Sequence, residues 1–260
     1  FALNIPVIRY KFFLVILTIS VGVLVAYSLP NGLTAIDITE YKPLSKILQI
    51  PGNKIITEVS SPRGLITIVE TNEIPLRYAP GLSVKNKIKL PEQMAMFKDG
   101  DSLLAINNFN NDFSTIDYLN YTTNALPYYL IKNPEVFILG LGGGENVLQS
   151  LYFYSKKIDV SEIDPLIADI LQEKYNNYVG KIYDLPQVQI HISEARNFFK
   201  QSHGLYDLIL IPPLESYAMS SIGLSSFSVS HLYTVEAIED YMQQLKPNGM
   251  LSITNWTKIP

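Results

Sequence analysis

Strand-like and helix-like segments alternate regularly over the second half of the chain, and this alternation leaves few possible architectures. The strand-like segments are EVFILGL, KKIDVSEI, VQIHIS, YDLILI and GMLSITNW. The helix-like segments between them lie near residues 146–154, 166–176, 194–201 and 234–245. Nearly continuous apolar strands that are separated by helices form parallel sheets with helices on both faces. The sequence therefore predicts an α/β fold with a doubly wound, mostly parallel, Rossmann-like sheet.

A smaller antiparallel β unit is predicted before this sheet. Residues 54–71 contain two runs rich in Ile, Val and Thr around Ser61-Pro62-Arg63-Gly64, a pattern typical of a hairpin with a turn longer than two residues. Another short strand is predicted over 101–108, after a long loop. We therefore expect a small β domain over 54–115 and a Rossmann-like domain over 116–260, truncated at its C-terminus.

The N-terminal segment is strongly apolar. The run from Phe12 to Leu29 is uncharged and follows Arg9 and Lys11. Its length is at the lower limit for crossing a hydrocarbon core of roughly 30 Å. We predict a transmembrane helix or signal anchor over 1–30, joined to the rest by a linker over 31–53. A buried core helix and a cleavable signal peptide are the alternatives.

The composition excludes several kinds of site. The chain has no cysteine, which rules out a disulfide framework, a thiolate metal site and a cysteine nucleophile. It has only three histidines, so we predict no metal. The net charge of −4 gives no support for a nucleic-acid partner.

A glycine-rich turn follows the first strand of the predicted sheet, in VFILGLGGGENVL. It contains Gly140, Gly142, Gly143 and Gly144. Glycines let the backbone turn sharply and let a ligand approach closely, and the N–H groups at the following helix start favour a polar or anionic group. The spacing differs from G-x-G-x-x-G, and the lysine of a phosphate-binding P-loop is missing. The turn therefore predicts a ligand site, but not by itself a pyrophosphate site.

Acidic residues follow the second and third strands of the same sheet. Glu162 ends the second strand, about 20 residues after the glycines, where an acid accepts hydrogen bonds from ribose hydroxyls. Glu194 follows the third strand and can accept from an exocyclic amine, or can merely start the next helix with Ser193 as its N-cap. Ile163 and Ala195 are predicted to line the same site. Together these residues predict S-adenosylmethionine or a relative as the cofactor, rather than NAD.

With these motifs, residues 54–256 resemble the spermidine synthases and other aminopropyltransferases, which have the class I S-adenosylmethionine-dependent methyltransferase fold. The similar segments are SSPRGLITIVE, VFILGLGGGENVL, VSEIDP, HISEARNFF and YDLILI. The apolar N-terminal run, PLRYAPGLS and LYTVEAIEDYMQQLKPNGMLSITNW resemble the membrane-associated bacterial subgroup. A complete sheet of this fold has more than five strands, so the resemblance implies that a final pair lies beyond Pro260 or is missing.

The family pattern is broken where its chemistry is expected. The resemblance implies a catalytic aspartate after the fourth strand, but this sequence has Pro212, which has no titratable group and no N–H. Glu215, Tyr217 and His231 are only weak candidates for the acceptor side, so the catalytic residue is left open. In the helical segment before the glycine turn, Asn120 is near the family's glutamine position and is assigned to the cofactor site.

We therefore expect a spermidine synthase-like transferase domain that binds S-adenosylmethionine, its decarboxylated form or methylthioadenosine. It would transfer an aminopropyl or methyl group to an unidentified small-molecule acceptor, with an amine fitting the family. The alternative is a non-catalytic nucleoside-binding domain that regulates a membrane protein. We expect a membrane-anchored protein with this domain on the cytoplasmic side, where such nucleosides are made. A homodimer is left open.

Overall fold

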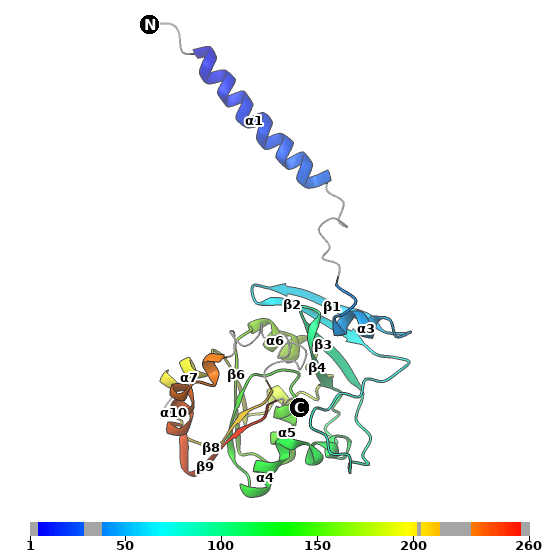
Figure 1. Ribbon diagram of the computed structural model, residues 1–260, viewed down its shortest axis with the longest axis vertical. Coiled ribbons are helices and arrows are strands. Elements are labelled where there is room, and N and C mark those ends of the chain that lie inside the picture. Colours follow the sequence, from blue (N-terminus) through cyan, green and yellow to red (C-terminus); the bar gives the residue numbers. More distant parts are fainter. Residues whose placement is uncertain (1–4, 29–37, 202–203, 214–229, 256–260) are drawn as a thin grey trace. The chain divides into compact units, whose positions relative to one another are not determined.

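The computed structural model describes residues 5–28, 38–201, 204–213 and 230–255. The chain divides into two compact units, Phe1–Thr39 and Glu40–Pro260. The first contains helix α1 (Ile5–Ser28). The second contains both sheets and the helices that pack on them (Figure 1).

Helix α1 does not have the properties of a membrane span. Within the described ranges, no helix is both long and apolar enough to cross a membrane. This finding contradicts the expected transmembrane helix and the expected membrane-anchored protein with its domain on the cytoplasmic side. A span needs about 20 consecutive, mainly apolar residues. Arg9 and Lys11 interrupt the apolar residues in the first half of α1, which begins at Ile5 and ends at Ser28.

The N-terminal part of the second unit is a four-stranded antiparallel sheet in the order β1-β2-β3-β4. It consists of β1 (Lys54–Ser61), β2 (Gly64–Glu70), β3 (Gln93–Lys98) and β4 (Asp101–Asn107), preceded by α3 (Pro43–Leu48). The predicted hairpin is confirmed as β1 and β2, and the predicted later strand is β4. Strand β3 was missed, because its QMAMFK sequence combines weak strand formers with burial on both faces and so shows no alternation.

The second sheet is five-stranded and parallel, in the order β7-β6-β5-β8-β9. Its strands are β5 (Glu135–Leu139), β6 (Lys157–Glu162), β7 (Val188–Ile192), β8 (Tyr206–Ile211) and β9 (Leu245–Ile253). This confirms the predicted parallel α/β fold. From β5 the chain adds strands on one side and then returns to add β8 on the other. A reversal of this kind opens a crevice at the carboxyl ends of the strands, where such folds bind ligands.

Helices cover both faces of the parallel sheet (Figure 1). One face carries α5 (Glu145–Tyr152) and α6 (Pro165–Asp169), which continues as a π-helical turn η3 (Ile170–Lys174). The other carries α7 (Ala195–Gln201) and α10 (Val235–Gln243). On that second face, Phe137, Phe199, Tyr206 and Tyr241 form a separate aromatic core. Short turns η4 (Ile182–Asp184) and η5 (Ser230–Leu232) complete the connections.

The segment before β5 differs from the continuous helix that its apolar spacing suggests. It forms the 3-10 helices η1 (Phe113–Tyr121) and η2 (Thr123–Ala125), followed by α4 (Leu126–Leu130). Thr122 interrupts them with an extended backbone (φ −91°, ψ 158°), and Pro127 opens the next helix. This break changes which polar side chains of the segment reach the sheet edge.

Side-chain hydrogen bonds join the two sheets. The Ser61 hydroxyl donates to Asp164 Oδ2 over 3.1 Å, and the hydroxyls of Thr57 and Tyr175 lie 2.6 Å apart. Lys174 also donates to Thr57 Oγ1 over 2.7 Å. The antiparallel sheet is thereby held against the carboxyl end of β6, where the predicted ligand acid lies.

Candidate functional site

A pocket of about 540 Å³ lies between the carboxyl ends of the parallel strands and the N-terminal sheet. The predicted site residues that line it are Gly140, Gly142, Gly143, Glu162, Ile163, Glu194 and Ala195, with Pro212 and His231. Residues from both sheets form its wall, so the pocket exists only when they are packed together. Gly144 is buried behind the turn as the N-cap of α5 and is not part of the lining.

The glycine turn fits tightly against the N-terminal sheet. A Cβ atom at Gly143 would lie 2.0 Å from the carbonyl oxygen of Ala105 in β4, far inside contact distance. Gly142 has a left-handed backbone (φ 54°), a conformation that glycine adopts without the cost a side chain would bring. The turn is therefore shaped by close backbone packing as well as by its exposure to the pocket.

Glu162 holds the glycine turn against the end of β6. Its buried carboxylate accepts hydrogen bonds from the N–H groups of Leu141 (3.0 Å) and Asp164 (2.8 Å). Burial raises the pKa of the Glu162 carboxyl, while these backbone bonds oppose the shift. A carboxylate has about four lone-pair positions, so two remain for a ligand.

Glu194 both caps α7 and faces the pocket. Its carboxylate accepts from the N–H groups of Arg196 (3.1 Å) and Asn197 (3.0 Å). The alternative interpretation, that this segment starts a helix, is thus confirmed. The residue that caps the helix is Glu194 and not the predicted Ser193. His231 Nε2 lies 3.8 Å from the Glu194 carboxylate, and the Arg196 side chain pairs with Asp240 at 2.9 Å. The cap leaves the ligand role of Glu194 open.

Pro212 lies at the pocket edge directly after β8. It is buried, and the carbonyl of the preceding Ile211 accepts from the Thr254 N–H over 2.9 Å. The weak catalytic candidates Glu215 and Tyr217 fall outside the described residues, and His231 is exposed. No carboxylate therefore stands at the end of β8 itself within the described residues.

An asparagine four residues after the predicted one reaches the pocket. Asn120 is hydrogen-bonded to the Tyr129 hydroxyl and is not part of the lining, whereas Asn124 is. Asn124 donates to Asn146 Oδ1 over 3.0 Å and accepts from the Thr254 hydroxyl over 2.7 Å. The backbone break at Thr122 explains the difference, because Asn124 lies after it.

Sequence reasoning also missed Glu145, in the first turn of α5. This partly buried residue lines the pocket, and its carboxyl has no hydrogen bond or ion pair with any other described residue. Burial raises the pKa of Glu145 to about 7. The available signal was its position directly after the glycines, at a helix start. An unpaired acid at a pocket wall is suited to bind a cationic group.

A family model described as the spermine/spermidine synthase domain matches residues 122–258. This stretch is more than half of the chain and includes the glycine turn, Glu162 and Glu194. The chain belongs to the spermine/spermidine synthase family. The predicted resemblance to this family is therefore confirmed, whereas no finding supports the membrane-associated subgroup.

Two curated relatives illustrate the match. The chain is 33% identical to spermine synthase of Arabidopsis thaliana over 129 residues, 48% of this chain and 33% of that protein. It is 28% identical to polyamine aminopropyltransferase of Clostridium perfringens over 122 residues, 46% of this chain and 39% of that protein. The matched region thus covers well under half of either relative.

Solved spermidine synthases are also similar to the chain. One from Thermotoga maritima is 20% identical, with a TM-score of 0.49 over 76% of this chain and 56% of that one. Another, in complex with the transition-state analogue AdoDATO, is 20% identical, with a TM-score of 0.46 over 74% of this chain and 53% of that one.

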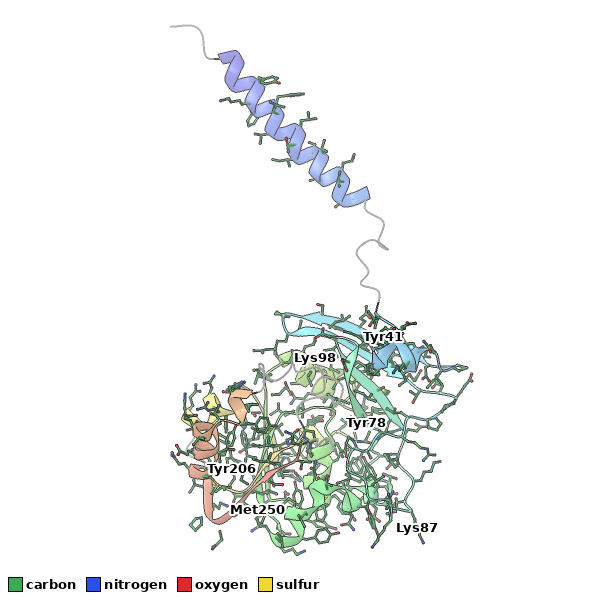
Figure 2. All side chains as sticks on the ribbon, viewed as in Figure 1. Tyr41, Tyr78, Lys87, Lys98, Tyr206 and Met250 are labelled. Atoms are coloured by element: carbon green, nitrogen blue, oxygen red, sulfur yellow. The ribbon has the colours of Figure 1, made fainter. Side chains whose placement is uncertain are left out.

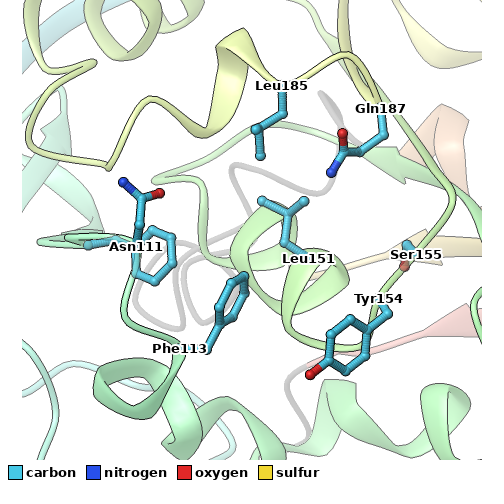
Figure 3. A pocket seen from close by; sticks show the side chains of 8 residues that line it. Asn111, Phe113, Leu151, Tyr154, Ser155, Leu185 and Gln187 are labelled. Atoms are coloured by element: carbon cyan, nitrogen blue, oxygen red, sulfur yellow. The ribbon is translucent and has the colours of Figure 1, made fainter.

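The described part of the chain offers no metal site, and its other pocket lacks the predicted ligand residues. In the described part of the chain, no group of three or more His, Asp or Glu residues could hold a metal ion. A second pocket of about 430 Å³ is lined mainly by uncharged side chains, including Phe113, Leu151 and Gln187 (Figure 3). Ser155 and Gln187 precede β6 and β7, so this pocket lies at the amino ends of the strands. It contains none of the predicted ligand residues.

Proposed function

We propose that this domain transfers an aminopropyl-type chain from a nucleoside sulfonium to an amine. The donor is S-adenosylmethionine or its decarboxylated form, and the second product is methylthioadenosine. The main support is that the glycine turn, Glu162 and Glu194 come from three different strand ends and line one pocket. Family membership and the names of the curated relatives support the transferase and polyamine assignments.

The proposed nucleoside contacts follow from the polar groups that the pocket offers. Glu162 has acceptor capacity left for the ribose hydroxyls after its two backbone bonds. Glu194 accepts from the adenine amine, while the exposed side chain of Ile163 and the small Ala195 offer apolar surface beside the ring. Gly142 and Gly143 allow the donor to approach the backbone.

The transfer itself needs little covalent help from the protein. The nitrogen lone pair of the acceptor attacks the carbon next to the positively charged sulfur, and the carbon–sulfur bond breaks. The sulfur keeps the bonding electrons and becomes neutral, and the nitrogen loses a proton to solvent. Positioning two reactants in line can supply much of such a rate. An acceptor amine that is protonated must lose a proton before its lone pair can attack, and Pro212 cannot accept that proton. The reaction therefore requires an acceptor amine that is already neutral.

Glu145 is proposed to bind the ammonium group of a substrate. Because its pKa is about 7, the carboxyl is mostly protonated at pH 6 and mostly charged at pH 8. We therefore expect affinity for a cationic substrate to rise by about 10-fold over this range, measured by isothermal titration calorimetry. The Glu145→Gln variant should bind weakly and without this pH dependence. Equal pH profiles for the two proteins would refute the role.

Ligand binding and turnover test the proposed function directly. We expect methylthioadenosine and at least one of the two sulfonium nucleosides to bind, and methylthioadenosine to be released from the sulfonium nucleoside when a member of a panel of amines and amino acids is added. Failure of all three nucleosides to bind would refute the site. Binding without methylthioadenosine release, across a panel of amines and amino acids, would refute the transferase and leave a nucleoside-binding domain.

A further inference from the structure

Two basic side chains lie at one end of the N-terminal sheet and line the pocket. Arg63 lies in the turn between β1 and β2, and Lys98 is the last residue of β3. Ile66 pairs with Lys98 across β2 and β3, which brings that turn and the end of β3 together. The Ser61–Asp164 hydrogen bond then holds the turn beside the end of β6. Both basic residues precede the stretch matched by the family model.

Neither positive charge is neutralised by the described parts of the protein. No ion pair or side-chain hydrogen bond of Arg63 or Lys98 occurs among the described residues. The nearby Asp99 is exposed, accepts from the Leu65 N–H over 2.8 Å and is not part of the lining. The N-terminal sheet thus contributes two cationic side chains and, within the described ranges, no carboxylate to the pocket.

The lining residues that come from the parallel-sheet part of the domain carry negative charge. Glu162 and Glu194 already accept backbone hydrogen bonds, whereas the Glu145 carboxyl has no partner among the described residues. The pocket therefore presents unpaired cations on one wall and an unpaired acid on another. A simple diamine carries only positive charge and would be repelled by Arg63 and Lys98. An α-amino acid group carries both an ammonium and a carboxylate.

We propose that this pocket takes a substrate bearing a carboxylate, which Arg63 and Lys98 hold. The inference rests on the proposed function and specifies its substrate class. The carboxylate has two potential sources. It belongs either to S-adenosylmethionine that has kept its carboxyl group, or to an amino-acid acceptor. In the first case the transferred chain is 3-amino-3-carboxypropyl. In both cases nitrogen–carbon bond formation, carbon–sulfur cleavage and loss of one proton from nitrogen balance the reaction, and the carboxylate is unchanged.

Two matched ligand pairs test the inference by calorimetry on the full chain. The first pair is S-adenosylmethionine and its decarboxylated form. The second pair is ornithine and putrescine, which differ by one carboxylate. Both are titrated into the protein with methylthioadenosine bound. We expect the carboxylated member of at least one pair to bind about 10-fold more tightly, the size of one charge-assisted hydrogen bond. The pair that shows the preference identifies the source.

Protein variants assign the preference to the two basic residues. In the Arg63→Ala/Lys98→Ala double variant we expect the preference to fall to about 1-fold, with methylthioadenosine affinity unchanged. The control is Lys85→Ala/Lys87→Ala, which removes the same charge from exposed residues outside the lining. Lys87 lies well away from Lys98 in Figure 2. A control variant that loses the preference as fully would refute the assignment.

Titration of the ligand pairs into the unmodified chain tests the carboxylate preference even if the double variant fails to fold. If methylthioadenosine binds but neither carboxylated ligand is preferred, the inference is overturned and the proposed function stands. If neither methylthioadenosine nor either sulfonium nucleoside binds the unmodified chain, the nucleoside site fails and both proposals are overturned.

Discussion

Replacing Gly143 by alanine is expected to abolish nucleoside binding and to lower the free energy of unfolding by about 3 kcal/mol. The new Cβ would lie 2.0 Å from the Ala105 carbonyl oxygen and 2.7 Å from its carbonyl carbon. Both atoms are backbone, so no side-chain rotation relieves the contact. Either β4 or the glycine turn must move, and both line the pocket.

Chemical denaturation and methylthioadenosine titration measure the two effects. Gly142→Ala is the matched control for the stability measurement, because a Cβ there would meet only Leu104 Cδ2, at 3.8 Å. The Gly142→Ala variant should lose about 1–2 kcal/mol in the free energy of unfolding, because alanine is strained in a left-handed backbone even where its side chain meets no clash. If the Gly143 variant is no less stable than the Gly142 variant, the two sheets are not packed through this contact.

The second large effect is expected for Glu162→Ala. Removal of the carboxylate leaves the N–H groups of Leu141 and Asp164 without their acceptor and removes the proposed ribose contacts. An unsatisfied buried donor costs about 1–3 kcal/mol. Because the raised pKa shows that burying this carboxylate is itself unfavourable, we expect a net loss of about 2 kcal/mol in stability. Nucleoside affinity should fall about 100-fold, as two charge-assisted bonds and the shape of the turn are lost.

Chemical denaturation and methylthioadenosine titration at pH 7 measure these two effects. Glu173→Ala, on the exposed side of η3, removes an equal charge away from the pocket and should change neither quantity. Glu162→Gln keeps one acceptor oxygen and should be intermediate in stability. Methylthioadenosine affinity that stays unchanged in Glu162→Ala would refute the ribose role, whatever the loss of stability.

The architecture of the parallel sheet was predictable because its signals are local. Apolar runs such as EVFIL and YDLILI, separated by segments of helical period, specify buried strands and covering helices without knowledge of the rest. The turn glycines and the acid at the end of the second strand follow from the same local pattern. Accordingly, the residues predicted from strand ends lie together in one pocket.

The features that were missed depend on distant parts of the chain. Asn124 replaces Asn120 because the backbone turns at Thr122. The lack of a hydrogen-bond or ion-pair partner for the Glu145 carboxyl among the described residues is a property of the packed wall. Arg63 and Lys98 come together only through the pairing of β2 with β3, a strand with no sequence pattern of its own. For α1, the uncharged run predicted a membrane span, whereas no helix in the described part of the chain is long and apolar enough to be one.

The bonds between the two sheets also bear on the order in which the protein folds. Ser61 and Asp164 are 103 residues apart in the chain, and Thr57 and Tyr175 are 118 apart. At the pocket, Thr254 after β9 and Asn124 in η2 are joined by a further bond over 130 residues. Closing such long loops costs entropy before any contact repays it, so contacts of this kind slow folding. Each hairpin and each strand–helix unit can form from nearby residues, whereas the pocket requires these distant contacts. Binding competence should therefore appear last during refolding, after most of the secondary structure has formed.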